Sequence, residues 1–185
     1  MIRSFSAKEL TFTAVGIALI AVCSWISVPM TIPFTMQTFA VCLAAAVLGL
    51  RCGVWAVVGY LLLGALGLPV FAGFRGGVSV LLGPTGGYLT GFLFPAALVG
   101  AAADRFGTRA TSLLAAMAFG IAVCYAFGTA WFMIVYARRS GPIGLGTALS
   151  WCVLPYLLPD TAKIVLASGL AARLCFLFPR EVKSA

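Results

Sequence analysis

The 185-residue chain contains no histidine, and only 4 of its residues are acidic. The missing histidine excludes the Ser–His and Cys–His pairs of nucleophilic catalysis and a histidine-ligated metal site. Its six cysteines are scattered singly without a CxxC pair, so the spacing of a thiolate zinc site is missing too. No GxxxxGK[ST] sequence cradles a phosphate, which excludes ATP hydrolysis by this chain. We therefore expect a protein that is not an enzyme and uses no metal or cofactor.

Charge of either sign is also scarce. Charged residues make up 9% of the chain, and hydrophobic residues make up 63%. A soluble domain uses roughly a quarter charged residues to cover its surface, so the lipid bilayer is the expected solvent. The net charge of +8 comes from bases that form neither a single cluster nor a nucleic-acid-binding motif. We interpret them as charges that set membrane topology, and we expect no nucleic-acid partner.

Six apolar segments predict an all-α integral membrane protein with a single membrane domain over residues 1–185. A membrane-crossing helix needs about 20 residues. The second and third segments are shorter than this and are joined by a tight GLRCG turn, so we expect them to form a close helical hairpin. The segments run over about 9–28, 36–50, 53–68, 84–103, 111–137 and 158–178.

Three connections between these segments are rich in proline or glycine. They are SVPMTIPFT (27–35), PVFAGFRGGVSVLLG (69–83) and the stretch 140–157, in which we expect a short helix. Non-helical backbone at membrane depth is tolerated only where protein covers it or where it lines a cavity. These connections are therefore candidates for lining a cavity.

The distribution of bases predicts the orientation of the chain. With the N-terminus inside, the three outer loops hold Arg75, Arg138 and Arg139. The cytoplasmic ends hold seven bases, namely Arg3, Lys8, Arg51, Arg105, Arg109, Arg180 and Lys183. This excess places both termini in the cytoplasm, and it places the three unusual connections on the outer side.

The stretch LPDTAK carries an acid and a base inside an otherwise apolar segment. We expect Pro159 at the first helical position and Asp160 in the first turn, where the helix dipole favours an anion. Lys163 lies three residues further and shares that face. The pair is either self-neutralising or part of a ligand site, since ionisable residues in membrane segments mark functional sites. Arg173, near the cytoplasmic end, is expected to snorkel.

Other polar or small residues have two readings each. Tyr88, which shares a helical face with Thr85, either contacts a ligand or anchors the chain at the interface. Gln37 needs hydrogen-bond partners from a ligand or from another helix. Ala14 and Ala18, four residues apart, permit close helix contact inside this chain or with a partner.

Gly87 and Gly91, in GPTGGYLTG, form a GxxxG pair. Small residues at this spacing let the backbone of another helix approach closely.

Four stretches in order resemble the BioY family, the biotin-binding S component of energy-coupling-factor (ECF) transporters. They are VPMTIPFTMQTFAV, GLPVFAGFRGG, LLGPTGGYLTGF and LPDTAK. The resemblance covers about residues 10–178. It implies six transmembrane helices with outer loops capping a ligand pocket, and biotin uptake at the cytoplasmic membrane of a prokaryote. The implied partners are a transmembrane coupling subunit (T component) and two cytoplasmic ATPase subunits.

The resemblance also implies roles for particular residues. The contact with the coupling subunit falls on Ala14 and Ala18. The ureido ring of biotin has two N–H donors and one carbonyl, which a carboxylate and an ammonium can satisfy. Phe71 and Phe92 are candidate apolar walls, and the end of biotin that the acid–base pair holds stays open. The candidate substrate-binding residues are Asp160, Lys163, Tyr88, Gln37, Thr85, Gly86 and Arg75.

Two alternatives remain at this point. An S component for thiamine would use a carboxylate with aromatic stacking and no nearby lysine, so Lys163 argues against it. A channel-like six-helix protein outside transport would need a polar stripe along the whole pore, whereas the polar residues here gather at one end.

Overall fold

The structure, a computed structural model, describes residues 5–177. Within this range the chain is helical apart from its connections and one short β-hairpin. In chain order the elements are α1 (Ala7–Trp25), β1 (Ser27–Val28), β2 (Phe34–Thr35), α2 (Gln37–Ala65), α3 (Val78–Leu81), α4 (Gly86–Gly91), α5 (Leu93–Phe106), α6 (Ala110–Ser140), α7 (Leu145–Cys152) and α8 (Leu154–Leu177).

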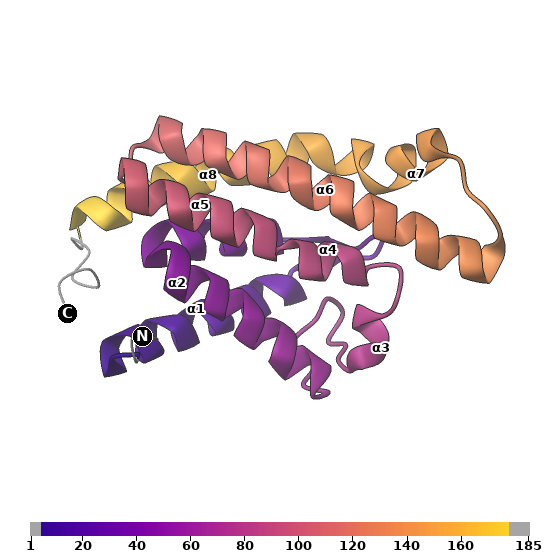
Figure 1. Cartoon of the computed structure of the whole chain (residues 1–185), viewed down its shortest axis with the longest axis horizontal. Coiled ribbons are helices and arrows are strands. Elements are labelled where there is room, and N and C mark those ends of the chain that lie inside the picture. The colour runs from indigo at the N-terminus through magenta and orange to yellow at the C-terminus, as the bar shows by residue number, and fades with distance from the viewer. Residues whose placement is uncertain (1–4, 178–185) are drawn as a thin grey trace.

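The described residues contain four apolar helical stretches long enough to cross a bilayer, namely α1, α2, α4 with α5, and α6. The pair α7 and α8, bent by 42°, adds a fifth if it is taken as one span. The long helices run along the long axis of the molecule (Figure 1). The start of α1 and the end of α8 lie at the same end, and α3 and the α6–α7 connection lie towards the other.

Helix α2 is folded back on itself near its middle. Gly49 has φ 82° and ψ −178°, a conformation that favours glycine. A Cβ at Gly53 would touch the backbone of Ala45, although residues eight apart in a straight helix lie about 12 Å apart. The carboxylate of Asp104 accepts a hydrogen bond from the backbone N–H of Leu50 at 3.0 Å, just after the turn. The helical hairpin predicted from GLRCG is thus present.

The connection between α2 and α3 is fixed to the C-terminal end of α1. The indole N–H of Trp25 donates to the carbonyl of Pro69 at 2.9 Å, and its ring stacks on Phe74 with centroids 5.1 Å apart. Ser24 donates to the carbonyl of Val70. These contacts hold the loop of residues 66–77 against the helix bundle.

The start of the last helix differs from the sequence prediction. Helix α8 begins at Leu154, so Pro155 occupies the first turn and Pro159 lies inside the helix. The prediction of Pro159 as the first helical residue was therefore wrong. The backbone N–H groups of Tyr156 and Leu157 already bond the carbonyl of Val153, so the first turn forms before Pro159 is reached.

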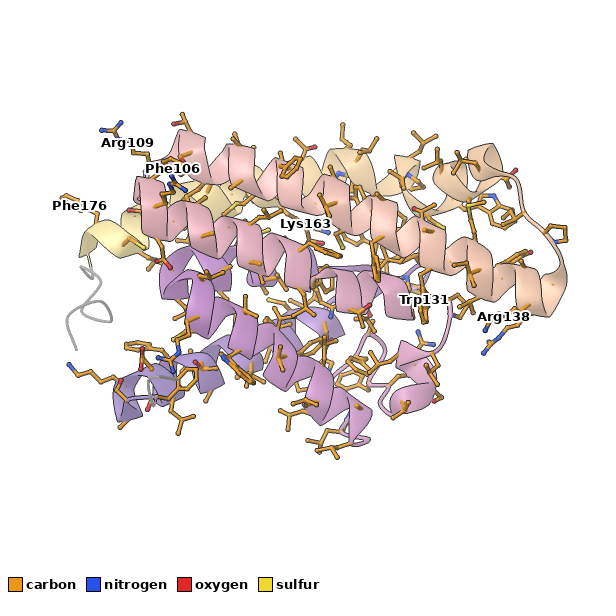
Figure 2. The ribbon with its side chains drawn as sticks, viewed as in Figure 1. Phe106, Arg109, Trp131, Arg138, Lys163 and Phe176 are labelled. Carbon is orange, nitrogen blue, oxygen red and sulfur yellow. The ribbon has the colours of Figure 1, made fainter. Side chains whose placement is uncertain are left out.

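The position of Asp160 changes with that correction. Asp160 follows the first turn of α8 instead of lying in it, so the N-terminal helix dipole does not account for its charge. Figure 2 shows Lys163 between the two ends of the molecule, with Arg109 and Phe176 near one end and Arg138 at the other. The predicted boundary at residue 178 and the bases Arg3, Arg180 and Lys183 lie outside the described residues.

Candidate functional site

A pocket of about 780 Å³, including the space at its open mouth, lies between the helices and the connections 27–35 and 69–83. Its wall is mostly apolar and is drawn from α2, α3, α4, α6, α7 and α8, from the β-hairpin segment, from the 66–77 loop and from Phe92 between α4 and α5. Five aromatic residues line it, namely Phe71, Tyr88, Phe92, Tyr125 and Tyr156.

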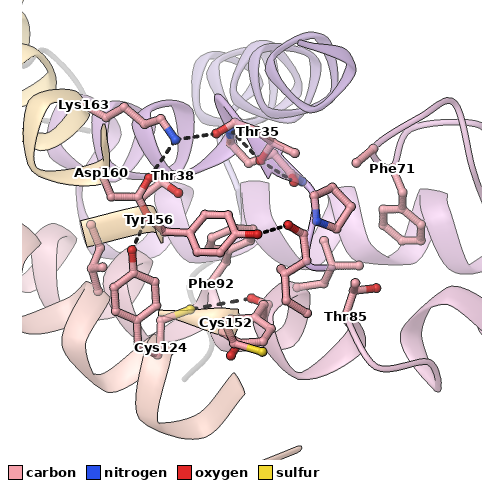
Figure 3. Close-up of a pocket in the computed structure, with 18 of the residues that line it drawn as sticks. Thr35, Thr38, Phe71, Thr85, Phe92, Cys124, Cys152, Tyr156, Asp160 and Lys163 are labelled. Carbon is pink, nitrogen blue, oxygen red and sulfur yellow. Dashed lines mark hydrogen bonds and ion pairs between the residues drawn. The ribbon is translucent and has the colours of Figure 1, made fainter. Parts of the chain in front are cut away.

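The ammonium of Lys163 is bound at one end of this pocket. Its Nζ atom donates to Asp160 Oδ1 at 2.7 Å and to the carbonyl of Thr35 at 2.7 Å (Figure 3). It also lies 3.7 Å from the ring centroid of Phe34, a cation–π distance. Lys163 is 4% exposed and Asp160 is 6% exposed. The pair is therefore buried, and it joins α8 to the second strand of the hairpin.

Tyr125 completes the hydrogen bonding of the buried carboxylate. Its hydroxyl donates to Asp160 Oδ2 at 2.5 Å from α6. Each oxygen of Asp160 therefore has a protein donor, and the net charge of the pair with Lys163 is zero. Sequence reasoning missed Tyr125, because a tyrosine in an apolar helix carries no signal of the residue it faces.

A second α8 side chain holds the same segment of the hairpin. The Tyr156 hydroxyl donates to the carbonyl of Ile32, two residues before the strand whose carbonyl Lys163 binds. Both acceptors are backbone atoms, so residue types in the sequence do not reveal these contacts. The pocket wall formed by residues 32–35 is thereby fixed to α8.

Gln37 belongs to a hydrogen-bond network between the two arms of α2. Its side-chain oxygen accepts from the hydroxyl of Thr35 at 3.0 Å, and its amide donates to the hydroxyl of Tyr60 at 2.5 Å. Gln37 also lines the pocket. The helix-partner reading of its amide is confirmed, and contact with a ligand stays a prediction.

Two glycines make room for aromatic rings of the pocket. A Cβ at Gly128 would overlap the ring of Tyr88, and a Cβ at Gly64 would overlap the ring of Phe71. The Tyr88 hydroxyl then lies 2.8 Å from the hydroxyl of Thr129 on α6. Small residues on facing helices thus set the positions of these two rings.

The glycines of α4 have different roles. The predicted close helix contact at Gly87 and Gly91 is present, because a Cβ at these positions would meet Trp131 and Cys124 of α6. Gly86 is absent from the pocket lining, since it packs against the backbone of Leu81. Its position supports the turn into α4.

Arg75 and Thr85 lie on the pocket wall with the more buried residues. Arg75 is exposed, and its Nε atom donates to the carbonyl of Ala72 at 3.2 Å. Arg75 and Lys163 are the only bases among the lining residues.

Ala14 and Ala18 are exposed on α1 and lie away from the pocket. Leu10 and Val15, on the same exposed part of the helix, are 64% and 60% exposed. The two alanines therefore do not serve packing inside this chain, which leaves them available to lipid or to another protein.

The fold and the site together define a multi-pass membrane protein with a mostly apolar pocket for a small molecule. The chain belongs to the BioY family, whose model matches residues 1–180. A relative from Thermotoga maritima, named biotin transporter BioY, is 41% identical over 168 residues, which cover 90% of this chain and 95% of that protein.

Two further comparisons agree with this family. A relative from Pyrococcus horikoshii, named probable biotin transporter BioY, is 41% identical over 170 residues, 91% of this chain and 96% of that protein. A crystal structure of the S component for biotin from an ECF-type ABC transporter matches with a TM-score of 0.81 at 27% identity. That match covers 92% of this chain and 94% of the other.

The buried pair predicts a specific pattern of stabilities in the protein without ligand. Removing one partner of a buried ion pair costs about 3–5 kcal/mol, because the other charge stays buried and unpaired. Asp160→Asn and Lys163→Met should each lower the midpoint of thermal unfolding in detergent. The double variant should be more stable than either single variant. A double variant destabilised by the sum of the two single effects would contradict the pairing.

Proposed function

We propose that this protein captures biotin as the substrate-specific subunit of an ECF transporter and takes part in its uptake across the membrane. The observation that carries the proposal is the buried Asp160–Lys163 pair on the wall of a mostly apolar pocket. The names of the two relatives, and of the protein in the matching crystal structure, support biotin as the ligand.

The hydrogen-bonding capacity of the pair suits a ureido ring. A carboxylate offers about four lone-pair directions, of which Lys163 and Tyr125 occupy two. Asp160 can therefore accept from a ureido N–H without losing a protein donor. Within residues 5–177 the third ammonium proton of Lys163 has no hydrogen-bond acceptor and only the ring of Phe34 beside it, so it is available to the ureido carbonyl.

Charge balance sets the orientation of biotin in this proposal. The Asp160–Lys163 pair has no net charge, so it gives a ligand carboxylate little attraction. Arg75 is the other base on the wall, and it lies exposed on the loop beside the mouth. The ureido ring therefore lies at the buried pair, and the valerate carboxylate lies at Arg75, where water also solvates it. The ring and chain between them contact Phe71, Tyr88 and other apolar wall residues.

The transport step needs partners. This subunit is not an enzyme, and ATP hydrolysis belongs to two cytoplasmic ATPase subunits joined through a transmembrane coupling subunit. Six membrane segments follow if the two arms of α2 are counted separately and α7 with α8 as one. Both termini then face the cytoplasm of a prokaryotic cell. The exposed Ala14 and Ala18 supply the small-residue surface on which the coupling subunit packs.

The first test is a calorimetric titration of the purified protein in detergent with biotin. We expect tight binding of about one biotin per chain. Asp160→Asn should weaken it at least about tenfold, because charge-assisted hydrogen bonds contribute about 1.5–3 kcal/mol. Folded wild-type protein that does not bind biotin would refute the function. Unchanged affinity in the variant would assign Asp160 a purely structural role.

The orientation predicts a selective effect of Arg75. Arg75→Gln should weaken biotin about fivefold, since an exposed cation is partly screened by solvent. Arg75→Lys should retain most of the affinity. Biotinamide, which lacks the negative charge, should bind the wild type and Arg75→Gln equally. An equal loss for biotin and its amide, measured by the same titration, would contradict this orientation.

If Ala14 and Ala18 contact the coupling subunit, substitutions there should block assembly with that subunit without changing biotin binding. Ala14→Trp and Ala18→Trp should bind biotin normally but fail to co-purify with the coupling subunit, because a large ring prevents close helix contact. Ala118→Trp, at an exposed alanine of α6, is the matched control and should assemble. Normal assembly of both α1 variants would rule out this surface.

A further inference from the structure

Among the buried polar and charged side chains of residues 5–177, one has no hydrogen-bond partner. Nine of the ten such side chains bond to the protein, and they are Glu9, Thr13, Ser24, Thr35, Gln37, Thr129, Asp160, Lys163 and Ser168. Thr38 is 8% exposed and lines the pocket, yet its hydroxyl has no partner in the part of the chain that the structure describes. A buried hydroxyl without a partner is rare in proteins, so it needs an explanation.

The start of α2 explains why this hydroxyl has no local acceptor. Threonines inside helices bond the carbonyl four residues earlier, as Thr13 and Thr90 do here. Thr38 is the second residue of α2, so the residue four earlier, Phe34, belongs to β2. The carbonyl three residues earlier, that of Thr35, already accepts from Lys163.

We infer that the Thr38 hydroxyl is a specificity-determining contact that accepts a hydrogen bond from a ureido N–H of the ligand. The inference rests on the proposed function, and it adds a ligand contact from α2. Figure 3 shows Thr38 at the end of the pocket that holds Asp160 and Lys163, where the ureido ring is placed.

The ureido ring requires an acceptor of this kind. It has two N–H groups on opposite sides of its carbonyl, and each needs an acceptor when buried. Asp160 faces one N–H when Lys163 donates to the carbonyl, which leaves the second N–H for another acceptor. A hydroxyl without a protein partner meets that need, and no protein bond has to break.

The test compares Thr38→Val, which removes the hydroxyl at nearly constant size, with Thr38→Ser, which keeps it. Titration with biotin should show about a fivefold loss for the valine variant, the value of one neutral hydrogen bond, and little loss for the serine variant. Two cyclic carbamate analogues, each with one ureido N–H replaced by oxygen, locate the contact. Thr38→Val should bind one of them as well as the wild type does.

The thermal stability of the protein without ligand distinguishes a ligand contact by Thr38 from a structural role. Thr38→Val should not lower the thermal stability of the protein without ligand, because no protein hydrogen bond is lost. Thr129→Val, which removes the partner of Tyr88, should lower it. Wild-type affinity for biotin in Thr38→Val, or equal losses for biotin and both carbamates, would overturn the contact alone. A wild type that does not bind biotin would overturn the proposed function with it.

Discussion

The ion pair between Asp160 and Lys163 is the interaction on which the pocket depends. Two charges taken into an apolar interior are stable only when they are close together and their remaining hydrogen-bonding groups are satisfied. Here the second carboxylate oxygen takes a bond from Tyr125 on α6, and the ammonium donates to the carbonyl of Thr35 in β2. Satisfying one buried pair therefore fixes the positions of α6, α8 and the hairpin relative to one another.

Glycine placement provides the space that this arrangement needs. Gly49 turns α2 back on itself, so that Gln37 on the first arm reaches Tyr60 on the second. Gly64 and Gly128 leave room for the rings of two pocket residues. The backbone can approach the aromatic rings closely at these positions. The pocket of this 185-residue chain can therefore be walled by aromatic rings.

The sequence was enough to predict the apolar helices, the turn at GLRCG and the association of unusual connections with a cavity, because hydropathy and glycine reflect constraints local to the chain. The start of α8 was predicted wrongly, since Pro155 and Pro159 both suit a first turn and only the fold decides between them. Tyr125 and Thr38 were missed for another reason. Their significance depends on which atoms lie opposite them, and the main partner of Lys163 outside its own helix is a backbone carbonyl that no residue type reveals.

Helix α1 connects the pocket with the proposed assembly surface. Its exposed alanines lie along the body of the helix, and its last residues, Ser24 and Trp25, bind the carbonyls of Val70 and Pro69. The loop held by these bonds carries Phe71 and Arg75 to the pocket wall. Inside the loop Phe71 pairs with Arg75. The N–H groups of Gly67 and Gly77 bond the carbonyl of Gly64, so α2 holds the loop as well as α1. The C-terminal end of α1 also continues into the hairpin, where the N–H of Met36 bonds the carbonyl of Ile26. One end of this helix therefore contacts both the loop at the pocket wall and the hairpin that Lys163 binds.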